Sequence, residues 1–199
     1  MNYLAHLFLA QPTAESCFGN LLGDFMRGVR PQDFSPPVRQ GLANHRLVDR
    51  ETDAHTQVLA CKALFSPTRR RFAGIIVDIV FDHFLIRHWS QFSAVPFDAF
   101  CQQRYTLLQQ QIPAMPASMQ RTVTGMVEHE WLKVYGQLDG VSRALDNTAA
   151  RIRFRHQFAG SIDEVLQHYT TLESAFLAFF PDLARTVAHQ NLEISVSAG

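Results

Sequence analysis

From residue 78 to residue 89 the chain reads Asp78-Ile-Val-Phe-Asp82-His83-Phe-Leu-Ile-Arg87-His88-Trp89, and this stretch decides the expected fold. Apolar residues fill most gaps between the charged ones, which predicts the middle of a long helix. Asp78 and Asp82 are four residues apart and therefore stack on one helix face, with His83 about 100° further round the axis. Two carboxylates and an imidazole in apolar surroundings are costly unless they are paired or bind a metal. The stretch alone leaves two interpretations open: a metal site, or a structural network completed by Arg87 or by backbone groups.

The rest of the chain predicts an all-α fold. Helical patterns are divided by Pro and Gly, and no alternating strand pattern or Asn-Gly hairpin signal occurs. We expect the long helix to start near Ser66 and end near Ser90, and a short last helix to open at Pro181. The other expected helices cover roughly residues 1–10, 14–28, from 36 onward, 97–111, 117–135, 138–149 and 162–179.

Length and composition indicate one globular domain. The chain has 199 residues, enough for a sizeable core, so we expect a single domain at 1–192 and a flexible tail at 193–199. The 18 basic residues balance the 18 acidic ones, which gives no global electrostatic case for nucleic-acid or membrane binding. Three widely spaced Cys without a CxxC motif indicate neither a disulfide framework nor a zinc knuckle. No leader-like segment or transmembrane-length apolar run is visible, so we expect a cytoplasmic protein.

A second pair of ligand-type residues repeats the spacing of the first. His45 and Asp49 are four residues apart within a segment expected to be helical, as Asp78 and Asp82 are. A run of alternating charges is usually a solvated surface, but the repeated spacing weakens that interpretation here. His6 lies off the apolar stripe of the first segment, where a lone His is more often a satisfied polar residue.

Two glycines interrupt the second expected helix. Gly19 and Gly23 each precede a polar residue, Asn20 and Asp24, and these two lie one turn apart on the same face. A Gly inside a helix costs about 1 kcal/mol relative to Ala, so two of them suggest that backbone or ligand approaches closely. Asp24 is thus a further candidate ligand, unless Arg27 is its structural partner.

Together these residues form a set of nitrogen and oxygen ligands without thiolates. Such a set suits Mn, Fe, Mg or Zn, and helical bundles build catalytic metal sites from side chains on facing helices. No P-loop, dinucleotide-binding glycine motif, Gly-x-Ser-x-Gly or Cys/His nucleophile arrangement is present. The candidate ligands are His6, Asp24, His45, Asp49, Asp78, Asp82 and His83.

Four motifs in this order resemble the bacterial acyl carrier protein phosphodiesterase family. They are Met1-Asn-Tyr-Leu-Ala-His6-Leu, Gly19-Asn-Leu-Leu-Gly-Asp24-Phe, His45-Arg-x-x-Asp49 with Thr52-Asp53, and Asp78-x-x-x-Asp82-His83-Phe-Leu with Arg87-His88-Trp89-Ser. The resemblance covers nearly the whole chain and is strongest in the first 90 residues. It implies an all-α bundle of the HD type of metal-dependent phosphohydrolase, working with Mn²⁺ or Mg²⁺. Since this chain has Asp82-His83 rather than His-Asp, ligand roles do not transfer simply from better-known HD enzymes.

The resemblance also implies a reaction and roles. The reaction removes 4′-phosphopantetheine from a Ser of holo acyl carrier protein, giving the apo protein. We expect the seven candidate ligands around the metal, with Mn²⁺ expected first and Mg²⁺ or Fe²⁺ as alternatives. Asp24, Asp82 and His83 are expected to act in catalysis, and Arg46 or Arg87 to neutralise charge on the phosphate in the transition state.

The carrier protein is acidic, whereas this chain has no net charge, so recognition requires a local basic patch. The densest cluster is Arg69-Arg70-Arg71, which is either this docking patch or a solvated helix start. Arg151, Arg153 and Arg155 are the next surface to consider. The oligomeric state is not predicted.

Two other functions remain open at this point. One is a different HD-type metal phosphohydrolase that acts on nucleotides or small phosphoesters. The other is a non-catalytic helical binding module that keeps the scaffold without the metal. A metal analysis separates the second from the enzymes, and a substrate panel separates the enzymes from one another.

Overall fold

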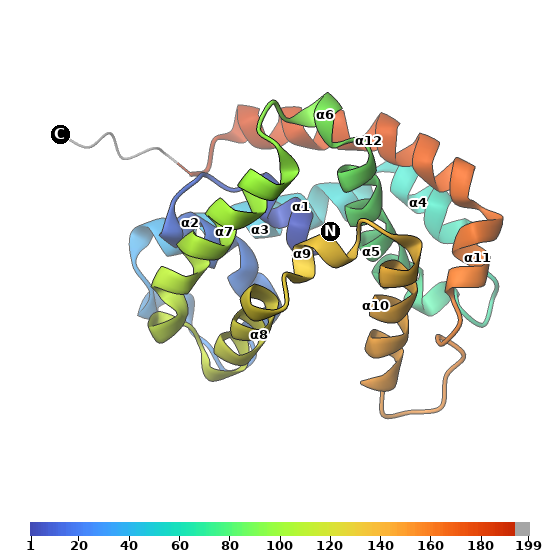
Figure 1. Cartoon of the computed structure of the whole chain (residues 1–199), viewed down its shortest axis with the longest axis horizontal. Helices are drawn as coiled ribbons and strands as arrows, with labels where there is room; N and C mark the ends of the chain where they lie inside the picture. The colour runs from blue at the N-terminus through green and yellow to red at the C-terminus, as the bar shows by residue number, and fades with distance from the viewer. Residues whose placement is uncertain (194–199) are drawn as a thin grey trace. The chain divides into compact units, whose positions relative to one another are not determined.

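The computed structural model describes residues 1–193 and consists of α-helices and short 3₁₀ helices (Figure 1). No strand occurs within these residues, so the predicted all-α class is confirmed. None of the helices in this part of the chain is long and apolar enough to cross a membrane.

The chain divides into two compact units, and each is described by itself. Unit 1 comprises Met1–Asn2, Glu51–Ala94 and Lys133–Leu183, and unit 2 comprises Tyr3–Arg50, Val95–Leu132 and the residues from Ala184 on. The expected single domain stays a prediction. Of the expected tail, residues 194–199 lie outside the described part of the chain, while Glu193 is buried.

Unit 2 is built around the packing of α2 against α3 and α7. Its elements are α1 (Tyr3–Phe8), α2 (Ala14–Leu22), η1 (Gly23–Phe25), η2 (Pro31–Asp33), the part of α3 (Pro36–Ala54) up to Arg50, α7 (Phe97–Gln111), η4 (Ile112–Ala114) and α8 (Ala117–Glu128). The hydroxyl of Thr13 caps α2 by accepting the backbone N–H of Ser16 at 3.2 Å. Nearly all of α2 is buried, and it lies beside α7 in Figure 1. The expected helix at 14–28 therefore ends earlier, at Leu22, and continues as the 3₁₀ turn η1.

Two glycines let α2 and α3 approach each other at backbone distance. A Cβ on Gly41 of α3 would lie 2.9 Å from Gly19 Cα and 2.9 Å from the Ser16 carbonyl oxygen of α2. A Cβ on Gly19 would in turn overlap the Val38 carbonyl oxygen. The first glycine interruption of the second expected helix, Gly19, thus has a packing cause.

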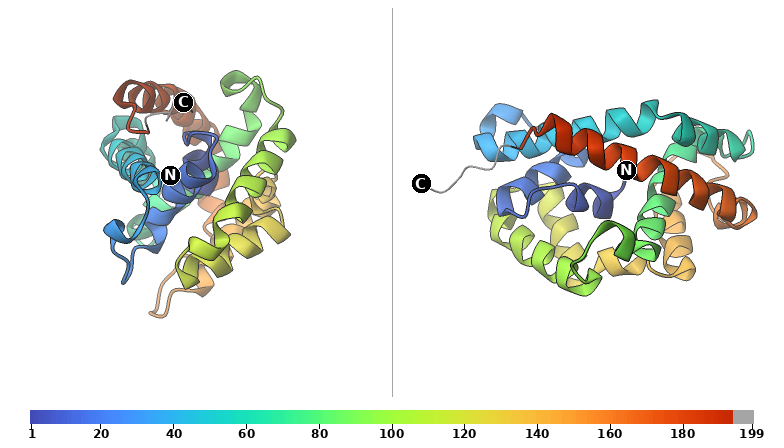
Figure 2. Two further views of the ribbon diagram at one scale, coloured as in Figure 1. Left: turned by 90° about the vertical axis from the view of Figure 1, so that its left-hand side faces the viewer. Right: turned by 90° about the horizontal axis from the view of Figure 1, so that it is seen from above.

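Unit 1 packs a buried helix, α5, among α4, α10 and α12. Its elements are α4 (Thr56–Leu64), η3 (Arg70–Phe72), α5 (Ala73–Arg87), α6 (Trp89–Phe92), α10 (Leu138–Ala150), α11 (Ile162–Gln167) and the part of α12 (Tyr169–Gln190) up to Leu183; α9 (Trp131–Val134) lies at the boundary of the two units. The core is aromatic, because Phe81 and Phe84 of α5 meet Phe176 of α12 with ring centroids 5.4 and 6.0 Å apart. In Figure 2 this part of α12 runs alongside α4.

Three expected boundaries differ from the structure. The long helix expected from Ser66 to Ser90 begins only at Ala73, after the separate turn η3. The helix expected at 117–135 is broken at Glu130, which adopts a positive φ of 48°. The break expected at Pro181 is wrong, since α12 continues through it. Burial of Phe180 and Leu183 on either side offsets the lost backbone hydrogen bond, which costs about 3 kcal/mol.

The α2–α3 contact predicts a large effect of one added methyl group. Gly41→Ala should lower the free energy of unfolding by about 1–3 kcal/mol, because backbone atoms on both sides of the new Cβ cannot move aside. Urea denaturation followed by circular dichroism measures this. Gly74→Ala in α5 is the matched control: its Cβ would meet only the Lys62 side chain at 3.7 Å, so stability should stay unchanged or rise by up to about 1 kcal/mol. Equal effects of the two substitutions would contradict this interpretation of the α2–α3 contact.

Candidate metal centre

Three of the predicted ligands converge in unit 2. His6 Nε2 of α1 lies 3.2 Å from Asp49 Oδ1, and His45 Nε2 of α3 lies 3.0 Å from Asp49 Oδ2. The two imidazole rings stack with centroids 4.0 Å apart and an interplanar angle of 17°. One ligand atom from each of the three residues falls within 4.8 Å of the other two, a spacing that suits one metal ion. The imidazoles are buried while the Asp49 side chain is 41% exposed, so the group opens to solvent at the carboxylate.

The ring of His45 is oriented by its second nitrogen and by a glycine. Nδ1–H donates to the Asn20 carbonyl oxygen at 2.7 Å, because a carbonyl can only accept. This hydrogen bond fixes the tautomer and leaves Nε2 to face Asp49, as in metal-binding His residues whose other nitrogen is held by the backbone. A Cβ on Gly23 would overlap the His45 ring, so only Gly leaves the ring its place. The second glycine interruption of the α2 sequence therefore serves the candidate site.

The three residues have pKa values that are shifted by burial and by their mutual hydrogen bonds. Burial lowers the pKa of His6 to about 4, so this ring is neutral near pH 7. Burial also acts to lower the pKa of His45, but its hydrogen bond and charge interaction with Asp49 raise it above the ordinary value. Burial acts to raise the pKa of Asp49, yet hydrogen bonds from His45 and His6 hold it well below its usual range. Asp49 is therefore an ionised carboxylate that stabilises the proton on the His45 ring.

A buried polar network supports the helix that carries His45. Asn44 Nδ2 donates to the Asn20 side-chain oxygen at 2.9 Å and also to the Leu9 carbonyl at 3.2 Å. Asn20 Nδ2 donates to Glu193 Oε1 at 2.8 Å, and the hydroxyl of Ser16 donates to the same oxygen at 2.7 Å. Burial raises the pKa of Glu193. The network ties the residue before His45 to a carboxylate near the C-terminal end of the described chain.

Asp24 and Arg46 are two exposed residues that directly follow Gly23 and His45 in the sequence. Asp24 follows Gly23 in η1, is exposed, and its charge helps to raise the pKa of His45. Arg46 follows His45 on α3 and is exposed. Neither belongs to the three-residue group, and Asp24 is the fourth predicted ligand in the same unit.

The other predicted ligands belong to unit 1. Asp78 Oδ1 forms an ion pair with the Met1 ammonium at 3.2 Å. Asp82 is fully buried. His83 has both ring nitrogens engaged: Nδ1–H donates to the Tyr135 carbonyl at 2.8 Å, and the Tyr169 hydroxyl lies 2.8 Å from Nε2, where it donates to the neutral ring. Burial lowers the pKa of His83. A metal at His83 would have to displace one of these hydrogen bonds.

Arg87 also takes part in a network within unit 1. Its Nε donates to Glu173 Oε1 at 2.7 Å, and His88 Nε2 lies 2.8 Å from the same oxygen. Although burial acts to raise it, hydrogen bonds from His88 and Arg87 lower the pKa of Glu173. Arg87 thus bonds to Glu173 and not to a carboxylate of the stretch, whereas His83 does bond to a backbone group, the Tyr135 carbonyl.

Sequence reasoning missed several residues around these groups. Asn44 and Glu193 bond to Asn20, Tyr169 bonds to His83 and Glu173 to Arg87. Each of these partners is distant in sequence, and no spacing rule links them. Gly23 did carry a signal, because a glycine within an apolar helical pattern indicates close approach.

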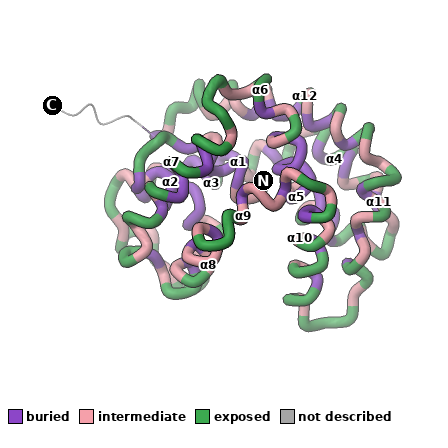
Figure 3. The backbone as a smooth tube through the Cα atoms, viewed as in Figure 1, coloured by how far each residue is buried: buried purple, intermediate pink, exposed green. Residues whose placement is uncertain are grey.

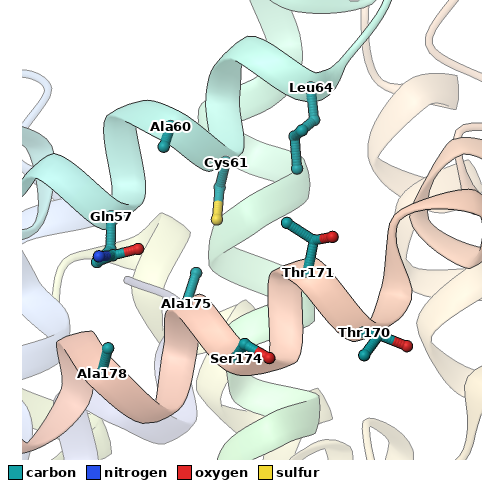
Figure 4. Close-up of a pocket in the computed structure, with 9 residues that line it drawn as sticks. All are labelled: Gln57, Ala60, Cys61, Leu64, Thr170, Thr171, Ser174, Ala175 and Ala178. Atoms are coloured by element: carbon teal, nitrogen blue, oxygen red, sulfur yellow. The ribbon is translucent and has the colours of Figure 1, made fainter.

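Unit 1 also contains a groove between α4 and α12 of about 520 Å³ (Figure 4). Small and polar side chains line it, including Ala60, Ser174 and Ala178. Its one titratable lining residue is Cys61, whose thiol pKa is raised to about 11 by burial, so the groove offers no acid–base or metal chemistry comparable to the His-His-Asp group.

Gly23→Ala should weaken metal binding without unfolding the chain. The new Cβ displaces the His45 ring, and disturbed support of a metal ligand typically costs roughly 10- to 100-fold in affinity. Titration calorimetry with Mn²⁺ measures the loss, and circular dichroism checks the helices. Gly74→Ala is again the control and should bind like the wild type; equal affinity of the Gly23 variant would show that His45 is not a ligand.

The affinity of the site for a metal ion should rise as the pH increases past the pKa of His45. Below that pKa the ring carries a proton on Nε2, which must leave before a metal binds there. His6 contributes little between about pH 6 and about pH 8, since its pKa of about 4 keeps it neutral. Calorimetric titrations across this range, with ring ¹⁵N shifts of the metal-free protein, test the assignment. The assignment of His45 as the residue that controls metal affinity is contradicted if His6 becomes protonated at a higher pH than His45.

Known proteins resemble the chain over its whole length. The sequence profile described as acyl carrier protein phosphodiesterase matches residues 1–183. A protein of that name from Serratia proteamaculans is 37% identical over 193 residues, covering 96% of this chain and all of the relative. Namesakes from Yersinia pestis and from Escherichia coli are 35% and 33% identical, with the same coverage.

No solved structure is a significant match, so the expected relation to HD-type folds stays a prediction. The family, in contrast, is shown by the sequence comparisons. The profile and the relatives each cover most of the chain, in agreement with the motifs around His6, Asp24 and His45. The chain belongs to the acyl carrier protein phosphodiesterase family.

Proposed function

We propose that this chain hydrolyses the phosphodiester that joins 4′-phosphopantetheine to a Ser of holo acyl carrier protein, giving apo carrier protein and 4′-phosphopantetheine. The description of the family and the names of its members support this substrate. The observation that carries the chemistry is the convergence of His6, His45 and Asp49 at the surface of unit 2. The predicted cytoplasmic location belongs to this proposal.

The site fits a divalent metal ion. His6 and His45 offer ring nitrogens and Asp49 a carboxylate oxygen, a donor set without thiolates that suits Mn²⁺, Mg²⁺ or Fe²⁺. We propose Mn²⁺ first. When bound, such an ion supplies a Lewis acid that activates water and neutralises charge on a phosphoryl group. The space left by Gly23 and the fixed tautomer of His45 support this assignment.

The chain's own residues orient the His45 ring and balance the charge of the site. Asp49 stabilises the proton on His45 Nε2 until a metal ion replaces that proton. The Asn20 carbonyl keeps the ring oriented toward Asp49. We propose that Asp24, exposed beside His45, adds a carboxylate to the site, and that exposed Arg46 binds the phosphate oxygens of the substrate.

Asp78, Asp82, His83 and Arg87 remain predicted site residues of unit 1. The hydrogen bonds of His83 and Arg87 favour a structural role for these two. A catalytic role requires that they release those partners when substrate binds. The experiment below therefore compares one carboxylate from each unit.

The test is incubation of the purified chain with holo carrier protein and Mn²⁺, followed by intact mass spectrometry. We expect conversion to the apo mass, and none in the presence of EDTA. Asp49→Asn should lose bound metal and lower kcat/KM by more than about 100-fold, because it removes the carboxylate between the two imidazoles.

Asp82→Asn is the matched control for that variant, since it makes the same change at a buried carboxylate of α5. Full metal content and turnover in the Asp49 variant, with loss of both in the Asp82 variant, would move the site to unit 1. Hydrolysis of nucleotides without hydrolysis of holo carrier protein would refute the substrate.

A further inference from the structure

The loop between α10 and α11 is strongly basic. It carries Arg151, Arg153 and Arg155 at alternate positions, and no acidic residue occurs between Asp146 and Asp163. A second basic run, Arg69-Arg70-Arg71, enters η3 in the same unit. Two segments about 80 residues apart in sequence thus bring positive charge to unit 1.

Arg69 anchors this loop and is not a free docking residue. Its Nε and Nη2 donate to the carbonyl oxygens of Gln157 and Ala159, and its Nη1 pairs with Glu164, each at 2.9 Å. Glu164 also accepts the backbone N–H and the hydroxyl of Ser66. All three nitrogens of the Arg69 guanidinium therefore donate to groups of the chain itself. The three arginines of the predicted docking patch are thus not equally available to a partner.

Aromatic stacking fixes the loop against η3. Phe72 stacks on Phe158 with ring centroids 5.0 Å apart and on Phe154 at 6.4 Å. The Arg71 guanidinium lies 4.6 Å from the Phe72 ring centre and 4.9 Å from that of Phe154, and it donates to the Arg155 carbonyl at 3.1 Å. The loop is thus preorganised, which lowers the entropy cost of binding a partner.

The loop carries its exposed arginines next in sequence to an exposed aromatic ring. Phe154 is 59% exposed, the highest value among the exposed large apolar side chains of residues 1–193. We call the set Arg71, Arg151, Arg153, Phe154 and Arg155 the Arg–Phe face, and every member is exposed. Arg70 is left out because its Nη2 donates to the carbonyl oxygens of Ala63 and Phe65. Figure 3 shows that much of the loop between α10 and α11 is exposed.

The nearby acids do not neutralise this face. Asp146 accepts the backbone N–H of Gly160 at 3.0 Å, and Glu164 is held by Ser66 and Arg69. The side chains of Arg151, Arg153 and Arg155 make no hydrogen bond or ion pair within the described chain. Exposed arginines that flank an exposed aromatic residue in the sequence are the composition of a protein-binding site, in which Arg and aromatic residues contribute most of the affinity.

We propose that the Arg–Phe face docks the acidic surface of the carrier protein, an inference that rests on the proposed function. Arg forms bidentate pairs with carboxylates, and Phe154, which lies against the Arg71 guanidinium, supplies an exposed apolar anchor. A nucleic acid is the less suitable occupant, because the chain as a whole has zero net charge and lacks the excess of basic residues typical of such proteins.

The experiment measures binding of apo carrier protein, which lacks the scissile bond, so that docking is separated from hydrolysis. Arg153→Gln/Arg155→Gln should bind roughly fivefold more weakly at low ionic strength, with a flatter salt dependence. With holo carrier protein, KM should rise while kcat stays unchanged. Phe154→Ala should weaken binding at every salt concentration.

The charge-matched control is Arg39→Gln/Arg121→Gln, which removes two exposed arginines of unit 2. It should bind like the wild type. Unchanged binding in the Arg153/Arg155 variant, equal weakening in the control, or capture of an oligonucleotide in preference to carrier protein overturns the inference. If the wild type binds apo carrier protein through this face but does not hydrolyse the holo form, the proposed function fails and the docking surface stands.

Discussion

The contact between the backbones of α2 and α3 is the constraint on which the candidate site depends. Gly19 and Gly41 remove the side chains that would keep the two helices apart. Only at this separation can the Asn20 carbonyl of α2 accept the ring N–H of His45 from α3. The same approach makes room for the His45 ring over Gly23. The position of a titratable ring is therefore set by groups that have no side-chain chemistry of their own.

Periodicity in the sequence predicted which residues share a helix face but not which faces meet. His45 and Asp49 were expected on one face and are joined in the structure, because a four-residue spacing fixes their separation within one helix. His6 reaches the same carboxylate from another helix, and only the packing of α1 and α3 brings it there. The all-α class and the family followed from patterns within the sequence, which need no knowledge of packing.

His45 and His83, both predicted as metal ligands from the sequence, differ in the group that faces their Nε2 atom. Each of His45 and His83 donates Nδ1–H to a backbone carbonyl. The other nitrogen of His45 faces a partly exposed carboxylate, whereas that of His83 faces the Tyr169 hydroxyl. Burial lowers the pKa of His83, while Asp49 raises that of His45. For His83 the deciding partner is Tyr169, which lies nearly 90 positions away in the sequence. No local motif could therefore reveal this difference.

The hydrogen bonds of Glu193 have a consequence for the order of events during synthesis. This residue satisfies Ser16 and Asn20 of α2, which would otherwise leave buried polar groups beside the helix that orients His45. Chains are made from the N-terminus, and domains usually fold as they emerge from the ribosome. Here α1, α2 and α3 emerge early, but Asn20 lacks its last partner until Glu193, 173 residues later, has been added. The His-His-Asp group therefore reaches its final rigidity only after Glu193 has joined the fold.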